Sequence, residues 1–430
     1  MRPLPHSSHH RRARHLHWTG VLCGLVAGAW LGGAEVPVKL ANPALSPFAV
    51  SLCMVAGVFA GRWTLPAVLK GSRHISKDFR AAPHLLVWGI LAGALWSVAN
   101  TLTIFAIRDI GLAIAFPLWN TNCLVGLFWG WLLFDELKGA RVAGWAKVAG
   151  GAIAILAAAF LLARASIHGV SIIPGHARHG ILAALGASVL WGTMYVPYRK
   201  AYISGMNPLS FVTIFTVGEL GAMTLLVAFA GGGLRPTVVA LAHSRGVVFW
   251  IFLGGFCWVV GDLFQQYATK LVGIGRAIPL SNTNQIWGLA WGALVFGELA
   301  AASGRQQLTV IAGSLLMLAG TLAISTATPT EQENQAARAV ILRESRRYRL
   351  DEARLLASHA GEEREPASGR RSKQDLLIAA AAVGVFLVLA RWAARPATPW
   401  STGWGAIMAL LLVATLLAGG WTLWRVTRFN

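Results

Sequence analysis

The feature that most constrains this chain is an internal duplication. Residues 92–137 return at 254–299, shifted by 162 residues without a gap, and 19 of the 46 aligned positions are identical. A second match lies upstream at a shift of 160, where GGAEVPVK at 32–39 corresponds to GTMYVPYR at 192–199. One unit of about five apolar segments is therefore used twice. Such doubling inside a membrane protein is typical of transporters.

The apolar content of the chain indicates a membrane protein. Of the 430 residues 56% are hydrophobic and 13% are charged, and the mean hydropathy is +0.58. Runs long enough to cross ~30 Å of hydrocarbon form ten predicted spans in two sets of five, and two further runs have no counterpart in either half. The predicted spans are Trp18–Val38, Pro47–Pro66, His84–Ile107, Ile110–Phe134, Ala143–Leu162, Gly180–Val196, Pro208–Ala230, Val247–Ala268, Gly273–Phe296 and Leu308–Ser325, followed by Leu376–Ala394 and Trp404–Trp424.

These spans predict an all-α polytopic membrane protein. Its core is a ten-helix repeat of five plus five helices, and two extra transmembrane helices follow. An odd number of spans per repeat places the two repeats in opposite orientations, so the repeat is predicted to be inverted. The predicted parts are an N-terminal tail (1–17), a first repeat (18–163), a second repeat (180–325), a charged linker (326–375) and a C-terminal extension (376–430).

The distribution of basic residues predicts the orientation in the membrane. A net charge of +20 is also common in nucleic-acid-binding proteins. Here, however, the basic residues are concentrated in every second loop, as in a membrane protein. With the amino terminus inside, the inner side carries 27 Lys and Arg residues and the outer side nine. This bias predicts a cytoplasmic-membrane protein with both termini in the cytoplasm, and no nucleic-acid partner.

Cysteine and histidine patterns indicate neither a metal nor a cofactor. All four cysteines lie in apolar segments without a Cys-x-x-Cys spacing. His176 and His179 supply too few ligands for a metal site. No phosphate-binding loop or Ser/His/Asp set is present, so the chain is not predicted to be an enzyme.

Paired prolines and amides predict a binding site at two broken helices. Pro117 and Pro279 occupy matching positions, and each frees a backbone carbonyl, which a membrane tolerates only beside a cavity or a packed partner. Amides near these breaks and on neighbouring spans are predicted to meet substrate hydroxyl groups, with aromatic rings as apolar walls. An amide clamp between helices is the alternative. The predicted amides are Asn100, Asn120, Asn122, Gln265, Asn282, Asn284 and Gln285, and the predicted aromatic residues are Trp119, Trp191, Tyr195 and Trp258.

Four ionisable residues are predicted to lie deep within the spans, whereas Arg62, near the end of its apolar run, is assigned to an inner loop. A charged group at a span centre costs ~3 kcal/mol on insertion scales, so each is a candidate for function. Asp262 and Arg276 lie at similar depth on neighbouring helices, and we predict either an ion pair between them or a part for Asp262 in substrate binding. Glu35 lies beyond a glycine stripe without a basic neighbour and is the predicted proton carrier. Glu219 is its rival in the second half.

Several motifs resemble the drug/metabolite transporter superfamily. These are VPVK at 36–39, WGTMYVPYRK at 191–200, and the repeat ends FDEL and FGEL. GALWSVAN at 93–100, followed by IGLAIAFPLWN at 110–120, resembles the sugar-porter branch, which includes glucose/ribose uptake proteins and rhamnose/proton symporters. By this resemblance Asn100 matches the Gly-Asn position of the family's third helix, and Asp262 replaces the asparagine in the second repeat.

The resemblance implies a secondary transporter that works by alternating access. Its predicted substrate is a small polar metabolite, a carbohydrate first of all, and protons or sodium are the predicted coupling ions. Two alternatives stay open: an exporter of amino acids or drugs from the same superfamily, and a membrane-embedded sensor or enzyme on a porter scaffold. The charged linker is predicted to lie as a helix on the anionic inner leaflet, or else to bind a regulatory partner.

The charge bias yields a test of orientation. Reporter fusions should place Arg73, Lys138 and Glu352 inside the cell, and Arg178 and Arg235 outside, because basic loops are retained on the cytoplasmic side. A reporter at Glu352 that is active outside the cell would contradict the predicted number of spans before it.

Overall fold

The described part of the chain is a bundle of long helices. The computed structural model describes residues 6–40, 45–165, 175–326, 330–359, 371–395 and 398–429, and these residues contain helices but no strand. The helices of the first half are α1 (His6–Ala34), α2 (Val36–Lys39), α3 (Pro47–Leu69), α4 (Arg73–Ala81), α5 (Leu85–Ile110), α6 (Leu112–Trp119), α7 (Asn122–Phe134) and α8 (Val142–Ala165).

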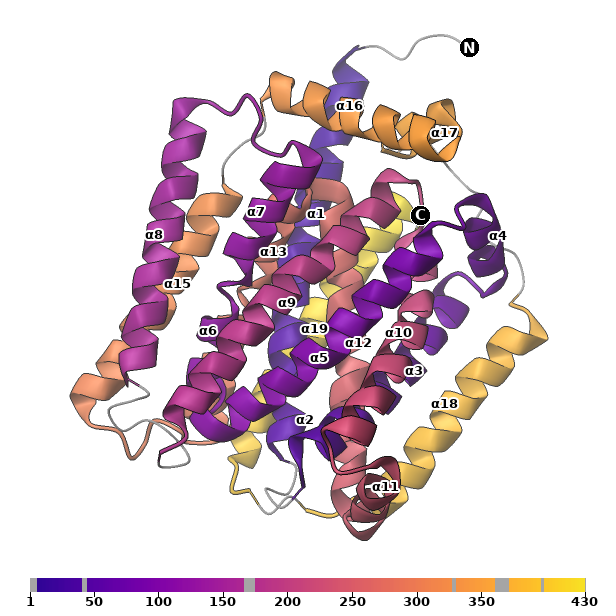
Figure 1. Ribbon diagram of the computed structural model, residues 1–430. Coiled ribbons are helices and arrows are strands. Elements are labelled where there is room, and N and C mark those ends of the chain that lie inside the picture. Colours follow the sequence, from indigo (N-terminus) through magenta and orange to yellow (C-terminus); the bar gives the residue numbers. More distant parts are fainter. Residues whose placement is uncertain are drawn as a thin grey trace.

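The second half repeats this order and continues beyond it (Figure 1). Its helices are α9 (Ala177–Ile203), α10 (Pro208–Phe229), α11 (Leu234–His243), α12 (Arg245–Val272), α13 (Ile274–Ser281), α14 (Asn284–Ala290), the π-helical turn η2 (Trp291–Val295) and α15 (Gly304–Ser325). The remaining helices are α16 (Glu331–Tyr348), α17 (Glu352–His359), α18 (Lys373–Trp392) and α19 (Thr402–Thr427).

Eleven helical segments in the described residues are long and apolar enough to cross a membrane, so the predicted all-α polytopic class is confirmed. They cover eleven of the twelve predicted spans. The predicted ninth span, Gly273–Phe296, is divided among α13, α14 and η2. Helix α1 begins at His6, within the segment predicted as the N-terminal tail (1–17).

Glycine lets pairs of helices cross at backbone contact. A Cβ atom at Gly93 of α5 would lie less than 3.0 Å from the carbonyl oxygen of Phe215 in α10, and one at Gly255 of α12 would lie equally close to that of Met54 in α3. Gly218 against Ile90 and Gly57 against Phe252 form a second such pair of contacts. In each pair of contacts, the two residues of one contact match the two residues of the other at the 161- and 162-residue shifts of the duplication. Without a hydrophobic driving force between helices in lipid, close backbone packing supplies much of their association.

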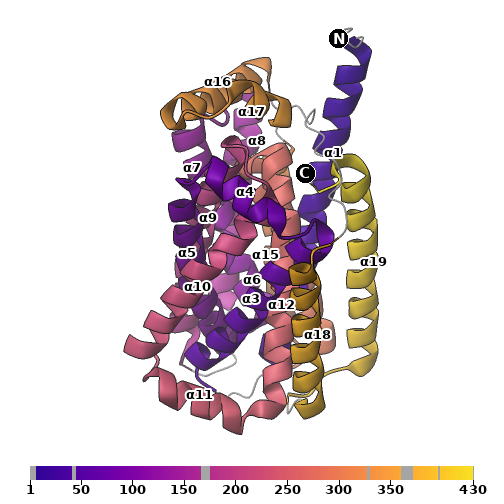
Figure 2. The ribbon, with the colours of Figure 1, turned by 90° about the vertical axis from the view of Figure 1, so that its right-hand side faces the viewer.

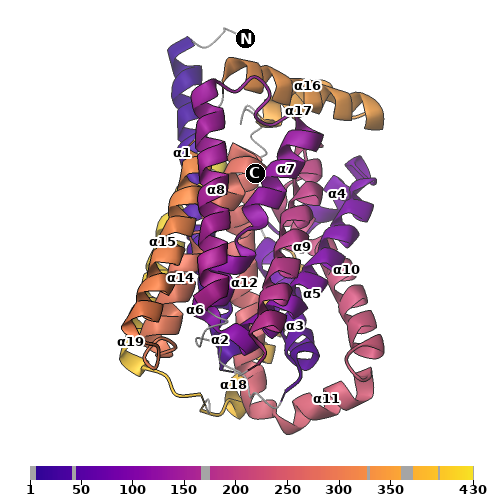
Figure 3. The same cartoon turned by 60° about the vertical axis from the view of Figure 1, so that its left-hand side comes forward.

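The charged linker packs on the protein itself. Helices α16 and α17 lie across one end of the bundle, roughly perpendicular to the spans (Figures 1 and 3). Two glutamates of α16 are buried and paired. Glu333 binds Arg276 at 2.9 Å, and Glu344 binds Lys200 at 2.6 Å. The helix predicted for this linker is present, and its charged partners are the ends of α13 and α9.

Ring packing adds to these contacts. His84, just before α5, stacks on Tyr348 of α16 with 3.6 Å between ring centroids. Burial lowers the pKa of His84 despite the opposing effect of Glu344, and Lys200 lowers it further, so the stacked ring is neutral at pH 7. Leu355 of α17 is also buried. Together these contacts fix α16 and α17 over the helix ends.

The two C-terminal helices flank the bundle. Helix α18 packs against α3 and α12, whereas α19 packs against α1 and η2 (Figure 2). Most of their apolar side chains are exposed, as is expected for helices that face lipid. The ends of α1 and α19 that carry His6 and Phe429 lie on the same side of the bundle as α16.

The glycine crossings predict an unequal response to the same substitution along α10. Gly218→Ala should lower the free energy of unfolding by about 1–3 kcal/mol, because its Cβ would meet the Ile90 carbonyl and the two backbones would have to separate. Gly221→Ala is the matched control, since nothing lies within 4 Å of its Cβ. Unfolding in detergent micelles measures both, and equal stability of the two variants would contradict the close crossing.

Candidate functional site: a pocket at two broken helices

Four asparagines join the two helix breaks reciprocally. Helix α6 ends before Asn120 and helix α13 ends before Asn282. The Asn120 side chain donates to the Asn282 carbonyl oxygen at 3.1 Å and to Asn284 Oδ1 at 2.6 Å. The Asn282 side chain donates to the Asn120 carbonyl oxygen at 2.7 Å and to Asn122 Oδ1 at 3.0 Å. Each break thus receives its donor from the other half of the chain, so the predicted amide clamp is present.

Two glutamates hold the opposite ends of the broken helices. Glu136 accepts hydrogen bonds from the backbone of Ile274 and Gly275 at the start of α13, at 3.2 and 2.8 Å. Glu298 does the same for the first two residues of α6, at 3.1 and 3.0 Å. The start of a helix carries unpaired N–H groups and a partial positive charge, which a carboxylate stabilises. Lys39 in turn lies 3.0 Å from Glu298.

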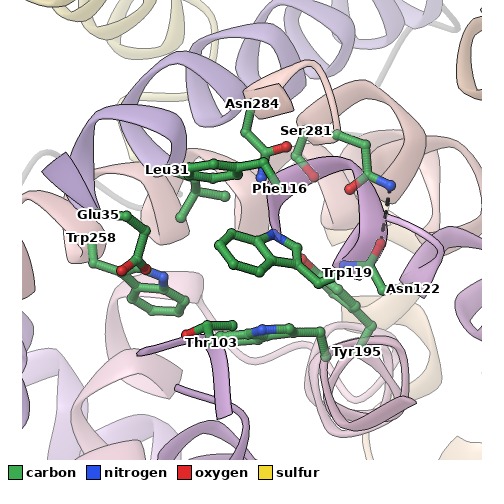
Figure 4. A pocket seen from close by; sticks show the side chains of 12 residues that line it. Leu31, Glu35, Thr103, Phe116, Trp119, Asn122, Tyr195, Trp258, Ser281 and Asn284 are labelled. Carbon is green, nitrogen blue, oxygen red and sulfur yellow. Dashed lines mark hydrogen bonds between the residues drawn. The ribbon is translucent and has the colours of Figure 1, made fainter. Parts of the chain in front are cut away.

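A small pocket lies beside the amide cluster (Figure 4). Its volume is about 40 Å³. Trp119 projects into the middle, with Glu35 and Trp258 at one end and Asn122 and Ser281 at the other. The lining residues are Leu31, Glu35, Thr103, Phe116, Trp119, Asn122, Trp191, Tyr195, Trp258, Ser281, Asn282 and Asn284. Eight of them were predicted as site or coupling residues, and they come from both halves of the chain.

The aromatic walls of the pocket are packed in place. Trp191 and Trp258 stack with 5.6 Å between centroids and an angle of 25°. Trp96, behind them, is fully buried and meets both rings edge-on, at 6.2 and 5.0 Å. Rings held in this way offer flat apolar surfaces without losing side-chain entropy when a ligand binds.

Glu35 is the only carboxylate that lines the pocket within the described residues. It sits at the short break between α1 and α2 and is 3% exposed. Its Oε2 atom has no hydrogen-bond partner, and no basic side chain in the described part of the chain pairs with it. A buried carboxyl group without a partner is costly in a stable fold, so its position at the pocket suggests a function.

The predicted ion pair between Asp262 and Arg276 is wrong. Asp262 Oδ2 binds Arg62 of α3 at 3.0 Å, and its Oδ1 accepts from Tyr198 of α9 at 2.6 Å. Arg276 instead faces the end of the bundle, where it binds Glu333. The physical reason is that Arg276 lies in the first turn of α13, at the level of α16, and not at the depth of Asp262.

Arg62 is the centre of this buried network. It is fully buried within α3, where the sequence had placed it in an inner loop. Its Nε atom binds Glu219 Oε1 of α10 at 3.0 Å, so one arginine serves two carboxylates on different helices. The guanidinium group also lies 4.1 Å from the ring centroid of Phe215 and 5.5 Å from that of Trp258. Through Trp258 the network supports the pocket wall.

The other predicted amides lie outside the pocket lining. Asn100 is buried and donates to Ser51 Oγ at 3.0 Å. Gln265 and Gln285 are buried, and neither amide group has a hydrogen-bond partner in the described residues. Sequence reasoning missed Leu31, Thr103, Phe116 and Ser281, which the helical periodicity could have placed on the pocket side of their helices.

Comparisons with known proteins agree with this arrangement. Residues 178–326 match the EamA-like transporter family. The chain is 23% identical over 239 residues to the glucose uptake protein GlcU of Staphylococcus xylosus, a match that covers 54% of this chain and 75% of that protein. It is 27% identical to a putative sugar uptake protein of Lactobacillus johnsonii, covering 28% and 42%, and 26% identical to the putative ribose uptake protein RbsU of Staphylococcus epidermidis, covering 38% and 52%. The chain thus spans about half or less of the last two relatives.

The helices, the pocket and these matches define a multi-pass membrane protein of the transporter class. Residues 178–326 form an EamA-like domain of the drug/metabolite transporter superfamily, and the relatives fit its sugar-porter branch. The resemblance read from the repeat motifs is confirmed.

The buried network predicts that removing Arg62 alone destabilises the protein more than removing all three charges together. Arg62→Met should lower the free energy of unfolding by about 3–5 kcal/mol, because it leaves Glu219 and Asp262 without their cation. Adding Glu219→Gln and Asp262→Asn should recover most of this loss, since the positions of the other repeat that match Arg62, Glu219 and Asp262 are neutral, namely Met223, Val58 and Asn100.

The control is Arg343→Met, which removes an exposed pair with Asp135 and should cost about 0–1 kcal/mol. Thermal and denaturant unfolding of purified variants measure all four proteins. A triple variant as unstable as Arg62→Met alone would show that charge pairing is not what the network contributes.

Proposed function

We propose that this protein is a secondary transporter that carries a sugar across the cytoplasmic membrane by alternating access, coupled to protons. The observation that carries the proposal is the pocket between two broken helices, which combines free amide and hydroxyl groups with fixed aromatic rings and one unpaired carboxyl group. Discontinuous helices at a repeat interface are where transporters of this kind bind their substrates.

The chemistry of the pocket suits a sugar. Asn122 and Asn284 accept hydrogen bonds at their Oδ1 atoms in the amide cluster, which leaves the side-chain NH2 group of each to donate to a substrate hydroxyl group. The hydroxyl groups of Thr103 and Ser281 donate to the carbonyl oxygens of Asn100 and Ile278, which leaves their oxygen atoms to accept from other substrate hydroxyl groups. A sugar ring also has apolar faces, and Trp119 and Trp258 offer flat surfaces for them. The names of three similar proteins, which refer to uptake of glucose, of ribose and of sugar, support the same substrate class.

The size of the pocket requires a conformational change. A volume of about 40 Å³ holds only a few water molecules, at ~10–15 Å³ for each, and is too small for a sugar. Substrate entry therefore requires the pocket to widen. The pairs Arg276–Glu333 and Lys200–Glu344 join the spans to α16 at one end of the bundle, and their release would accompany opening toward that side.

Glu35 is the proposed proton site. An ionised carboxyl group in a closed apolar pocket without a cation is unfavourable, so a proton on Glu35 favours closure around the substrate, and its release follows opening to water. Glu219 was the rival candidate, but its carboxylate binds Arg62 and it lies outside the pocket lining. Glu35 is therefore the better coupling residue.

A lipophilic cation is the second candidate substrate. Trp119, Trp191 and Trp258 surround a space that also contains the Glu35 carboxyl group. Aromatic faces with a nearby carboxylate attract quaternary ammonium groups. In that case the same proton site would serve an exporter that exchanges protons for the cation.

Transport by the purified protein in liposomes tests both candidates. With an imposed proton gradient, the wild type should accumulate a labelled sugar from a panel that includes glucose and ribose. Glu35→Gln should abolish accumulation but retain exchange of labelled for unlabelled sugar, because the shape of the pocket is kept while the titrating group is lost. Glu331→Gln, at an exposed carboxyl group of α16, is the control and should transport normally.

The outcomes separate the candidates. Equal accumulation by Glu35→Gln and the wild type would contradict the coupling role of Glu35. If no sugar in the panel exchanges while a quaternary ammonium dye is driven out by the proton gradient, the sugar proposal fails and the cation exporter is supported.

A further inference from the structure

A second and much larger cavity lies away from the pocket, between α19 and the bundle. Its volume is about 450 Å³. Every side chain that lines it is apolar, and they come from α1, α3, α12 and α19. Helix α18 packs against α3 and α12 while α19 packs against α1 and η2, so the two C-terminal helices stand apart beside α12 (Figure 2).

The cavity is elongated along the membrane normal. On α12 its lining extends from Leu253 to Phe264, which is ~16 Å of helix at ~1.5 Å per residue. On α19 it extends from Leu416 to Leu423, or ~10 Å, and Phe429, just beyond the end of that helix, also lines it. These lengths match an extended hydrocarbon chain that lies parallel to the helices.

Water is a poor occupant of such a cavity. A water molecule needs two to four polar partners, and apolar cavities stay dry. An empty space of this size would also leave its lining without packing contacts. Within spanning helices the material at hand is the acyl chain of a membrane lipid.

A basic and aromatic group lies at the C-terminal end of α19, next to the lining residue Phe429. The guanidinium group of Arg428, just beyond the helix, lies 3.9 Å from the ring centroid of Trp424. That of Arg425 lies 4.8 Å from the ring centroid of Trp421, but Arg425 stands on the face of α19 opposite the lining residues Gly420 and Leu423. Neither arginine pairs with a carboxylate in the described residues. Tryptophan and arginine at this position are typical of the membrane interface, where lipid headgroups lie.

We propose that this cavity is a lipid-binding site that takes one acyl chain of an anionic phospholipid, whose phosphate group binds Arg428. The lipid fills the space between the transporter bundle and α19, and so joins the C-terminal extension to the rest of the molecule. The site is independent of the sugar pocket.

Gly420 allows a sharp test. It lines the cavity, and nothing lies within 4 Å of its Cβ position, so Gly420→Leu fills the space without a clash. Gly384→Leu of α18 is the matched control, because its Cβ position is equally open but lies outside the cavity. Native mass spectrometry of the full chain with phosphatidylglycerol should show at least a fivefold loss of one bound lipid in Gly420→Leu and none in Gly384→Leu.

A charge variant tests the headgroup. Arg428→Gln should keep the bound lipid but abolish the preference for phosphatidylglycerol over phosphatidylcholine, whereas Arg425→Gln, on the opposite face of α19, should retain that preference. If Gly420→Leu does not fold, Leu416→Trp fills the same cavity. Equal lipid retention by the cavity-filling variant and Gly384→Leu would overturn the proposal, and an unchanged preference in Arg428→Gln would overturn the headgroup contact.

Discussion

The reciprocal hydrogen bonds among four asparagines are the interaction on which the rest of the structure depends. Lipid offers no donor to the carbonyl groups that a helix break exposes, so every one must be satisfied by protein. Here the Asn120 and Asn282 amides satisfy each other's backbone. Each of these donors comes from the other half of the chain, so the hydrogen bonds join the two breaks across the interface between the halves. The same cluster sets Asn122 and Asn284 beside the pocket.

The carboxylates at the other ends complete this dependence. Each broken helix has a glutamate from the opposite half at its start and an asparagine from the opposite half at its end. The amides at the breaks and the charges at the starts thus act across one interface. The pocket lies at this interface between the two halves, as the proposed alternating access requires.

The sequence predicted the helical spans and their breaks better than it predicted which side chains contact each other across the bundle. Spans follow from apolar length, and the breaks follow from Pro117 and Pro279, both of which are local signals. Arg62 was misplaced because an arginine near the end of an apolar run looks like a loop residue, and its partners lie 157 and 200 positions away. Glu136 and Glu298 were recognised in the FDEL and FGEL motifs at the repeat ends. The neighbouring sequence, however, does not show which helix start each of them binds. The docking of α16 likewise depends on distant ion pairs.

The buried charges also indicate which helices can move. Arg62, Glu219, Asp262 and Tyr198 join α3, α10, α12 and α9 through charged hydrogen bonds, whose separation in a dry interior would be costly. The repeat-related position, between α5 and α10, holds a weak contact between Thr101 and the Met223 sulfur at 3.8 Å. The four joined helices therefore form a frame that is costly to separate. If the pocket widens as proposed, we expect the movement in the lining helices outside this frame, namely α1, α5, α6, α7, α13 and α14.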